Sequence, residues 1–223
     1  AIGGNGFCGM SRKDMLLILQ GCCGEVGIEM EFQREILSLD QLRPDADMII
    51  AANGINSWVR DEFVDHFKPS FDWRPNKFVW LGSTKPLPAF TFDFRENEAG
   101  IWNLHAYQYN SEMSTMIVET TEQTWKKAGM EKASEDETVA YVSNLYADLL
   151  DGHPIITNRS VWRNFPMIRC ETWVKDNLVI MGDCAHTAHY SIGSGTKLAM
   201  EDAIALFECC KQEANPREAL KLY

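Results

Sequence analysis

Two short runs of apolar residues stand out because neither is long enough to form a helix. Residues 178–181 read Leu-Val-Ile-Met, and residues 48–52 form a second run that ends at Asn53 and Gly54. Such runs are typical of strands buried on both faces, as in parallel sheets. Because parallel strands bring their carboxyl ends to one edge, we expect Asn53 and Asp183 to flank one ligand site. The alternative is a hairpin turn at Asn53-Gly54.

The first run leads through Gly182 and a loop to Gly193-Ser194-Gly195 and a helical pattern. Its apolar face is expected to hold Leu198, Ala199, Ala203, Leu206 and Cys210. Backbone N–H groups of Ser194, Gly195 and Thr196 would lack intrahelical partners, and this positive helix start favours an electron-rich ligand. A tight strand-to-helix turn without a ligand is the alternative.

The amino-terminal part predicts a helix followed by a strand. Ser11 is a good N-cap, and an apolar face follows it at Met15, Leu16, Leu19, Cys22, Cys23 and Val26. Arg12 falls at the first helical position, where the helix dipole opposes a cation, so it is either an anion contact or a solvated arginine. Residues 28–37 alternate loosely as a strand. Residues 4–9 match G-x-G-x-x-G, but a loop is the better interpretation because no strand precedes them.

Residues 78–121 predict an antiparallel meander, with apolar or alternating runs separated by turn-prone residues at 96–100 and 110–114. His105, Tyr107 and Tyr109 share one face of a strand and combine rings with polar groups. They are the candidates for a substrate pocket, although aromatic strands are more often ordinary core. A short helix at 122–127 and a longer one opened by a capping box at 134–137 complete this part.

Composition narrows the functional classes. The formal net charge of −11 argues against a nucleic-acid partner, and no apolar run reaches the length of a membrane span. Seven cysteines without metal-site spacing are expected to be free thiols in a reducing cytoplasm. Asp183, His186 and His189 could together bind a metal only if this segment were helical, which Gly182 and Gly193 oppose.

The segment Gly-Asp-x-Ala-His, six residues, Gly-x-Gly, then Glu-Asp-Ala, resembles the second flavin motif of the single-component FAD aromatic hydroxylases, which are similar to para-hydroxybenzoate hydroxylase. Residues 52–60 resemble the same family's Ala-Asp-Gly-x-x-Ser-x-x-Arg motif, with Asn53 in place of the aspartate. The family motifs usually carry proline at the position of Tyr190 and asparagine at that of Lys197.

The resemblance implies an α/β fold: a partial dinucleotide-binding fold with a parallel sheet and an inserted antiparallel-sheet substrate domain. It implies FAD contacts by Arg12, Asn53, Gly54, Gly182, Asp183, Gly193, Ser194, Gly195 and Thr196, and substrate contacts by His105, Tyr107, Tyr109, His189 and Tyr190. The expected division is 1–66 and 175–223 for FAD and 67–174 for substrate. The segment bearing the FAD pyrophosphate fingerprint is expected to precede this chain in a longer protein.

The implied reaction is hydroxylation of a small aromatic substrate by O2 through a flavin C4a-hydroperoxide, with NADH or NADPH as reductant. The branch that resembles this sequence most in 105–109 and 191–197 acts on aryl-CoA thioesters such as salicylyl-CoA and 2-aminobenzoyl-CoA. Three alternatives stay open: an indole-type flavin hydroxylase, a truncated remnant without activity, and a metal-dependent hydrolase at Asp183, His186 and His189. No catalytic base is identified.

Overall fold

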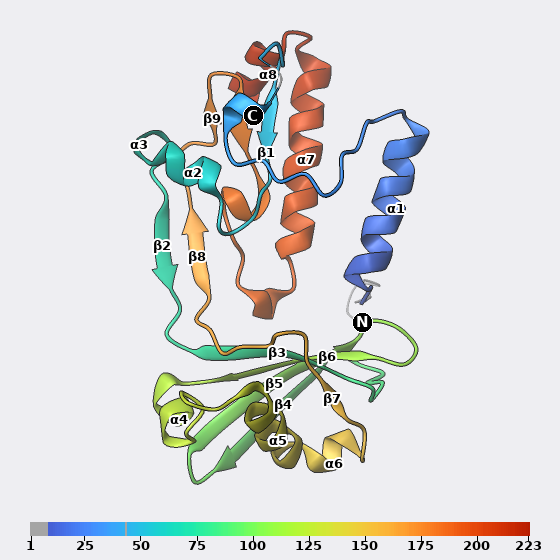
Figure 1. Ribbon diagram of the computed structural model, residues 1–223, viewed down its shortest axis with the longest axis vertical. Coiled ribbons are helices and arrows are strands. Elements are labelled where there is room, and N and C mark those ends of the chain that lie inside the picture. Colours follow the sequence, from blue (N-terminus) through green and yellow to red (C-terminus); the bar gives the residue numbers. More distant parts are fainter. Residues whose placement is uncertain (1–8, 43) are drawn as a thin grey trace. The chain divides into compact units, whose positions relative to one another are not determined.

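The computed structural model describes residues 9–42 and 44–223, which form two compact units (Figure 1). One unit comprises Ala1–Glu31 and Pro75–Phe165, and the other comprises Phe32–Arg74 and Pro166–Tyr223. The glycine-rich segment 4–9 lies, except for Gly9, outside the described residues. The domain boundaries expected at 66 and 174 stay a prediction.

The first unit, called here the sheet unit, is built on five strands in the order β4-β5-β6-β3-β7. The strands are β3 (Lys77–Ser83), β4 (Thr91–Asn97), β5 (Gly100–Gln108), β6 (Ser114–Thr120) and β7 (Ile155–Ile156). All neighbours are antiparallel, as the alternating runs predicted. The meander order was wrong for β3, which pairs with β6 rather than with β4.

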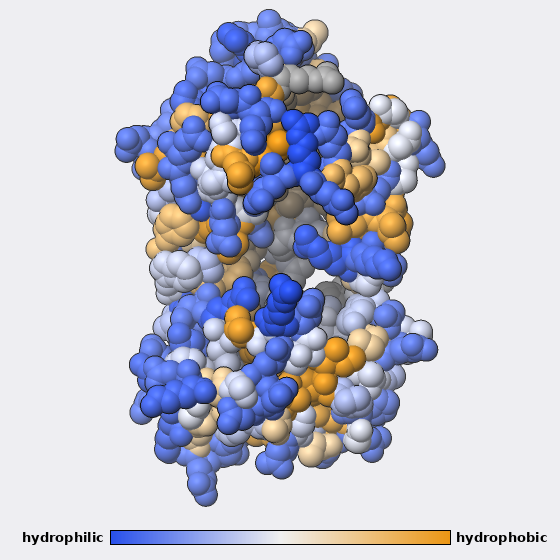
Figure 2. All heavy atoms as spheres, in the orientation of Figure 1, coloured by the Kyte–Doolittle hydropathy of each residue, from blue (hydrophilic) through white to orange (hydrophobic). Residues whose placement is uncertain are grey.

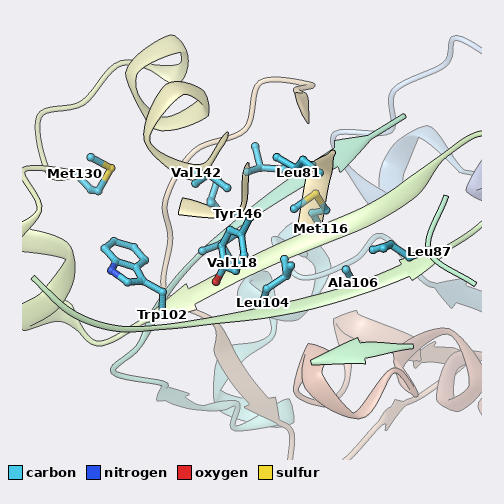
Figure 3. Close-up of a cluster of buried hydrophobic side chains, with 12 residues drawn as sticks. Leu81, Leu87, Trp102, Leu104, Ala106, Met116, Val118, Met130, Val142 and Tyr146 are labelled. Atoms are coloured by element: carbon cyan, nitrogen blue, oxygen red, sulfur yellow. The ribbon is translucent and has the colours of Figure 1, made fainter. Parts of the chain in front are cut away.

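Strand alternation decides which side chains of the sheet unit enter its core. On β5, Trp102, Leu104 and Ala106 are fully buried, and they pack with Val118 of β6 and other apolar side chains (Figure 3). The helices that pack over the core face of the sheet include α4 (Glu122–Lys127), α5 (Glu135–Leu145) and α6 (Ala147–Leu150). The expected capping box opens α5: Ser134 and Glu137 each accept a hydrogen bond from the other's backbone N–H.

The helix expected at the amino-terminal end is present as α1 (Arg12–Glu25), with Ser11 as its N-cap. The apolar face predicted for this helix is not buried, because no residue of α1 is buried. Leu17 and Ile18 are more than half exposed, and apolar side chains gather at the surface over α1 (Figure 2). The strand predicted for 28–37 was wrong: this segment is irregular and Gln33 has a φ of 56°. Its alternating apolar side chains are exposed, so no burial favours a strand there.

The second unit, called here the motif unit, carries the two apolar runs as strands. β1 (Ile49–Ala51) pairs with β10 (Leu178–Ile180) in parallel, and β9 (Val174–Lys175) pairs antiparallel on the other side of β10. β2 (Ser70–Trp73) and β8 (Pro166–Arg169) form a separate antiparallel pair. The short helices are α2 (Trp58–Glu62), α3 (Val64–Phe67) and the 3-10 turns η2 (Leu39–Gln41), η3 (Gly182–Cys184) and η4 (Tyr190–Ile192).

Both faces of β10 are buried, as the unbroken apolar run predicted. Leu178 and Ile180 pack in a cluster with Ala51 and side chains of α2 and α3. Val179 packs on the other side, in a cluster to which α7 (Gly195–Gln212) and α8 (Pro216–Leu222) contribute. In the described part of the chain, no helix is long and apolar enough to cross a membrane.

The core of the sheet unit makes a stability prediction. Leu104→Ala removes a fully buried side chain from this core and should lower the free energy of unfolding by about 2–5 kcal/mol. Leu17→Ala is the matched control: this leucine is 55% exposed on α1, so the change should stay within about 0.5 kcal/mol. Urea unfolding followed by tryptophan fluorescence measures both, and equal losses would contradict the assigned core.

Candidate functional site

The parallel pairing of β1 and β10 brings the two sequence motifs to the same edge of the sheet. Ile49 lies opposite Leu178 and Ala51 opposite Ile180, so the strands run level and end together. Asn53 follows β1 by two residues, and Asp183 follows β10 by three. The hairpin alternative at Asn53 is therefore wrong: the chain turns at Gly54, with a φ of 83°, and enters α2 instead.

A hydrogen-bond chain joins the Asn53 motif to the Asp183 motif. Ser57 caps α2 by accepting from the backbone N–H of Arg60, and its hydroxyl donates to Asn53 Oδ1 at 2.5 Å. The thiol of Cys184, which follows Asp183, donates to Ser57 Oγ at 2.9 Å. Ser57 and Cys184 are fully buried, so their partners replace lost water contacts. Burial also raises the pKa of the Cys184 thiol, which stays protonated as this donor role requires.

Arg60 ties the same two loops from the other side. Its side chain is 2% exposed, and its Nη1 donates to the carbonyls of Ile55 at 3.0 Å and Cys184 at 3.4 Å. The Nε atom pairs with Asp61, and the guanidinium lies over the ring of Phe71 at 5.1 Å. A buried arginine that bonds both loop backbones fixes them relative to each other. Its place in the motif was noted in the sequence, but this bridging role was not.

A buried carboxylate on α7 holds the turn that presents Asp183. Asp202 Oδ2 accepts from the backbone N–H of Gly182 at 2.8 Å and lies 2.8 Å from Nε2 of His186. Gly182 has a φ of 60°, and a Cβ there would meet Ala199 of α7 at 3.4 Å, so glycine suits both the backbone and the packing. Trp173 stacks on His186 with the ring centroids 4.7 Å apart. Asp183 itself is exposed.

The sequence reasoning missed Asp202 because it assigned the buried face of α7 to apolar residues. The helix is turned from that expectation: Asp202 and Leu206 are its buried residues, while Ala203 and Cys210 are exposed. A signal was present, since Leu198, Asp202 and Leu206 recur every four residues along one face. An acid within an apolar stripe predicts a buried partner.

The amino-terminal end of α7 offers backbone N–H groups without a side-chain cap. The helix begins at Gly195, and its N-cap Ser194 makes no side-chain cap hydrogen bond. A Cβ built on Gly195 would meet nothing within 4 Å, so packed side chains do not block this turn within the structure described. Gly193, two residues before the helix, has a φ of 67°, in the left-handed region that favours glycine. The N–H groups of Gly195, Thr196 and Lys197, in the first turn of this helix, have no acceptor within the helix. Ser194, the other residue predicted for this role, is the N-cap.

His189 and Tyr190 lie in the loop before this helix. His189 is the N-cap of η4, and its Nδ1 lies 2.8 Å from Ser191 Oγ, while its ring packs 4.2 Å from that of Tyr190. Both residues are half-buried. The metal alternative has no support: His186 pairs with Asp202, and among the described residues no three His, Cys, Asp or Glu side chains are grouped to hold a metal ion.

The other candidate residues belong to the sheet unit. Arg12 is the first residue of α1, as expected. His105 and Tyr107 share the face of β5 that points away from the core, and Tyr109 follows the end of that strand. Phe90 stacks on Tyr107 at 5.6 Å with the rings 8° apart. Burial raises the pKa of Tyr107, so its hydroxyl is neutral at physiological pH.

Comparisons with known proteins agree with the two motifs. A family model described as "FAD binding domain" matches residues 33–213. Salicyloyl-CoA 5-hydroxylase of a Streptomyces species is 37% identical over 231 residues, covering 100% of this chain and 44% of that protein. Protodeoxyviolaceinate monooxygenase of Chromobacterium violaceum is 31% identical over 219 residues, covering 97% of this chain and 58% of that protein. The chain thus spans about half the length of these relatives.

Solved structures show the same fold at low sequence identity. 2-Methyl-3-hydroxypyridine-5-carboxylic acid oxygenase superposes with a TM-score of 0.71 at 14% identity, over 95% of this chain and 60% of that one. The flavin-dependent brominase Bmp2 gives a TM-score of 0.65 at 13% identity, over 91% and 56%. The α/β class with an antiparallel sheet, expected from the sequence, is confirmed.

The role of Asp202 in the Gly182 turn can be tested by its removal. Asp202→Ala leaves the buried N–H of Gly182 without its acceptor and should lower the free energy of unfolding by about 1–3 kcal/mol. Asp202→Asn keeps an acceptor oxygen of the same shape and should lose less. Glu201→Ala, at the exposed neighbouring position, serves as the control in urea unfolding. Equal stability of Asp202→Ala and Glu201→Ala would contradict the role.

Proposed function

The chain belongs to the FAD binding domain family of FAD-dependent monooxygenases, and from this premise we propose that the intact protein hydroxylates an aromatic ring using O2 and NADH or NADPH. The proposal depends on one observation: the parallel strands β1 and β10 end at the same level. The Asn53 and Asp183 motifs therefore lie at the same edge of the sheet. The carboxyl edge of parallel strands is where ligands bind in α/β folds.

The donors and acceptors at this edge suit FAD. Asp183 is an exposed carboxylate that can accept hydrogen bonds from the sugar-alcohol hydroxyls of the cofactor. The uncapped N–H groups at the start of α7 favour negative charge, such as that of a reduced flavin ring. Asn53 and Gly54 line the end of the partner strand. When bound, FAD supplies the redox and oxygen-activating chemistry.

The chain's own residues then have positioning roles. Asp202, Ser57 and Arg60 hold the two loops so that Asp183 and the helix start face one ligand. Arg12 is proposed to contact FAD from α1. His189 and Tyr190, together with His105, Tyr107 and Tyr109, are proposed to contact the substrate. Their rings can exclude water from the reacting carbon, as oxygen transfer requires.

We propose an aryl-CoA thioester as the substrate. The support is the 37% identity to salicyloyl-CoA 5-hydroxylase across the whole of this chain. An indolic substrate is the second candidate, supported by 31% identity to protodeoxyviolaceinate monooxygenase. The third candidate is a remnant without activity. It is retained because Asn53 stands where the family motif has an aspartate.

One assay separates these candidates. The intact protein, purified with its flavin, should oxidise NADH or NADPH in an O2-dependent reaction that salicyloyl-CoA or 2-aminobenzoyl-CoA accelerates, with a hydroxylated thioester as product. Mass spectrometry of the product and flavin absorbance provide the readouts. Turnover of indole derivatives alone would favour the second candidate. A flavin-free protein without turnover would support the remnant.

The role of Asp183 makes a quantitative prediction about FAD binding. Asp183→Ala should raise the dissociation constant of FAD by about 10- to 100-fold, the range expected for losing hydrogen bonds to a charged group. Flavin fluorescence during titration with the apoprotein measures this constant. Asp65→Ala, which removes another exposed carboxylate of the motif unit, should leave it unchanged. An unaltered affinity in Asp183→Ala would remove this residue from the cofactor site.

A further inference from the structure

The face of the five-stranded sheet that points away from the core has a regular pattern of side chains. Strand register sets residues directly opposite one another in rows, and opposite residues share a face. One row runs Phe94, Asn103, Glu119, Phe78, and the next runs Phe92, His105, Ile117, Trp80. Aromatic rings therefore line both sides of this face, on β4 and β3. Three of the four middle positions, on β5 and β6, are polar, and the fourth is Ile117.

We call Asn103, His105 and Glu119 the polar stripe. Asn103 Nδ2 donates to His105 Nε2 at 2.7 Å, and Glu119 Oε2 lies 3.5 Å from the same nitrogen. Asn76 Nδ2 donates to Glu119 Oε1 at 2.7 Å. The side chains of His105 and Glu119 are only 5% and 12% exposed, so little water weakens these contacts.

The polar stripe is rich in acceptors. The oxygen of Asn103, Oδ1, is buried and accepts no hydrogen bond from the described residues. A carboxylate such as Glu119 has about four lone-pair sites in all. Leaving a buried acceptor unpaired costs free energy, so a ligand that brings an O–H or N–H donor here gains more than one that brings only an apolar edge. A second carboxylate would be repelled by Glu119.

Exposed rings border the polar stripe. Trp80, Phe92 and Phe94 are 46%, 52% and 68% exposed, although each lies on a strand of the sheet. The ring of Phe92 packs edge-on against His105, with centroids 4.7 Å apart. Exposed aromatic side chains on a sheet favour contact with another flat ring. Flat rings beside a narrow band of acceptors fit a small aromatic molecule with a donor substituent.

We propose that the polar stripe supplies the acceptors that anchor a hydroxyl or amino group on the ring of the substrate. This inference rests on the proposed function, because it names a part of the molecule that the enzyme hydroxylates. Asn103 Oδ1 and Glu119 accept the hydrogen bonds from the ring substituent. His105 holds Asn103 by accepting from its amide group, and Asn76 holds Glu119 by donating to it. An enzyme site built to bond a hydroxyl rejects the analogue that lacks it, because its buried polar groups are then left unpaired.

Pairs of ligands that differ only in the ring substituent test the anchor. Salicyloyl-CoA and benzoyl-CoA are titrated into the FAD-loaded protein without reductant, and isothermal calorimetry gives both dissociation constants. The hydroxylated ligand should bind at least about tenfold more tightly to the unaltered protein. Glu119→Gln and Asn103→Ala should each bring this ratio toward one, mainly by weakening salicyloyl-CoA. Glu112→Gln, at an exposed site in the same unit, should keep the full ratio.

The outcomes separate this anchor from the wider proposal. A ratio near one in the unaltered protein, or a full ratio in a folded Glu119→Gln protein, overturns the anchor even if aryl-CoA hydroxylation is observed. If neither thioester binds, the aryl-CoA assignment fails, and salicylamide against benzamide repeats the comparison without CoA. A ratio above about tenfold in that pair still supports the anchor. Failure of all four ligands to bind overturns it.

Discussion

The parallel pairing of β1 with β10 is the constraint on which the candidate site depends. Register places Ala51 opposite Ile180, so both strands end at the same level and the two motif loops begin side by side. A shift of the register would separate the loops along the strands and break the bonds between them. Burial of β10 on both faces opposes such a shift, because the clusters on its two sides receive alternate residues.

Buried polar bonds then give the loops their shape. Ser57 and Arg60 link the first loop to Cys184 in the second, and Asp202 fixes the glycine turn before Asp183. These groups lie among apolar clusters, where an unpaired polar atom is costly. The network therefore specifies one loop arrangement more strongly than apolar packing alone would. In the sheet unit, by contrast, His105 and Glu119 lie on the face of the sheet that points away from the apolar core.

The sequence predicted the features that depend on neighbouring residues. Ser11 and Ser134 cap their helices as expected, because capping uses atoms three residues apart. The apolar runs became strands. Errors arose where a pattern depended on a partner distant in the sequence. Residues 28–37 alternate but are exposed, and β3 pairs with β6 although β4 and β5 lie between them in the sequence. Loop closure costs grow slowly with length, so sequence distance did not decide that pairing.

The sequence by itself determined the family motifs, the two apolar strands β1 and β10, the helices capped by Ser11 and Ser134, and the glycines that turn after β1 and β10. Only the tertiary structure decided that Asp202 supports the Gly182 turn and that Asn103 and His105 lie beside Glu119. The reason is physical. A helix cap or an apolar run depends on residues that are close in the sequence. These contacts instead join residues of different elements, and which face each element turns toward its neighbour is decided only when the apolar surfaces of the whole unit are buried together.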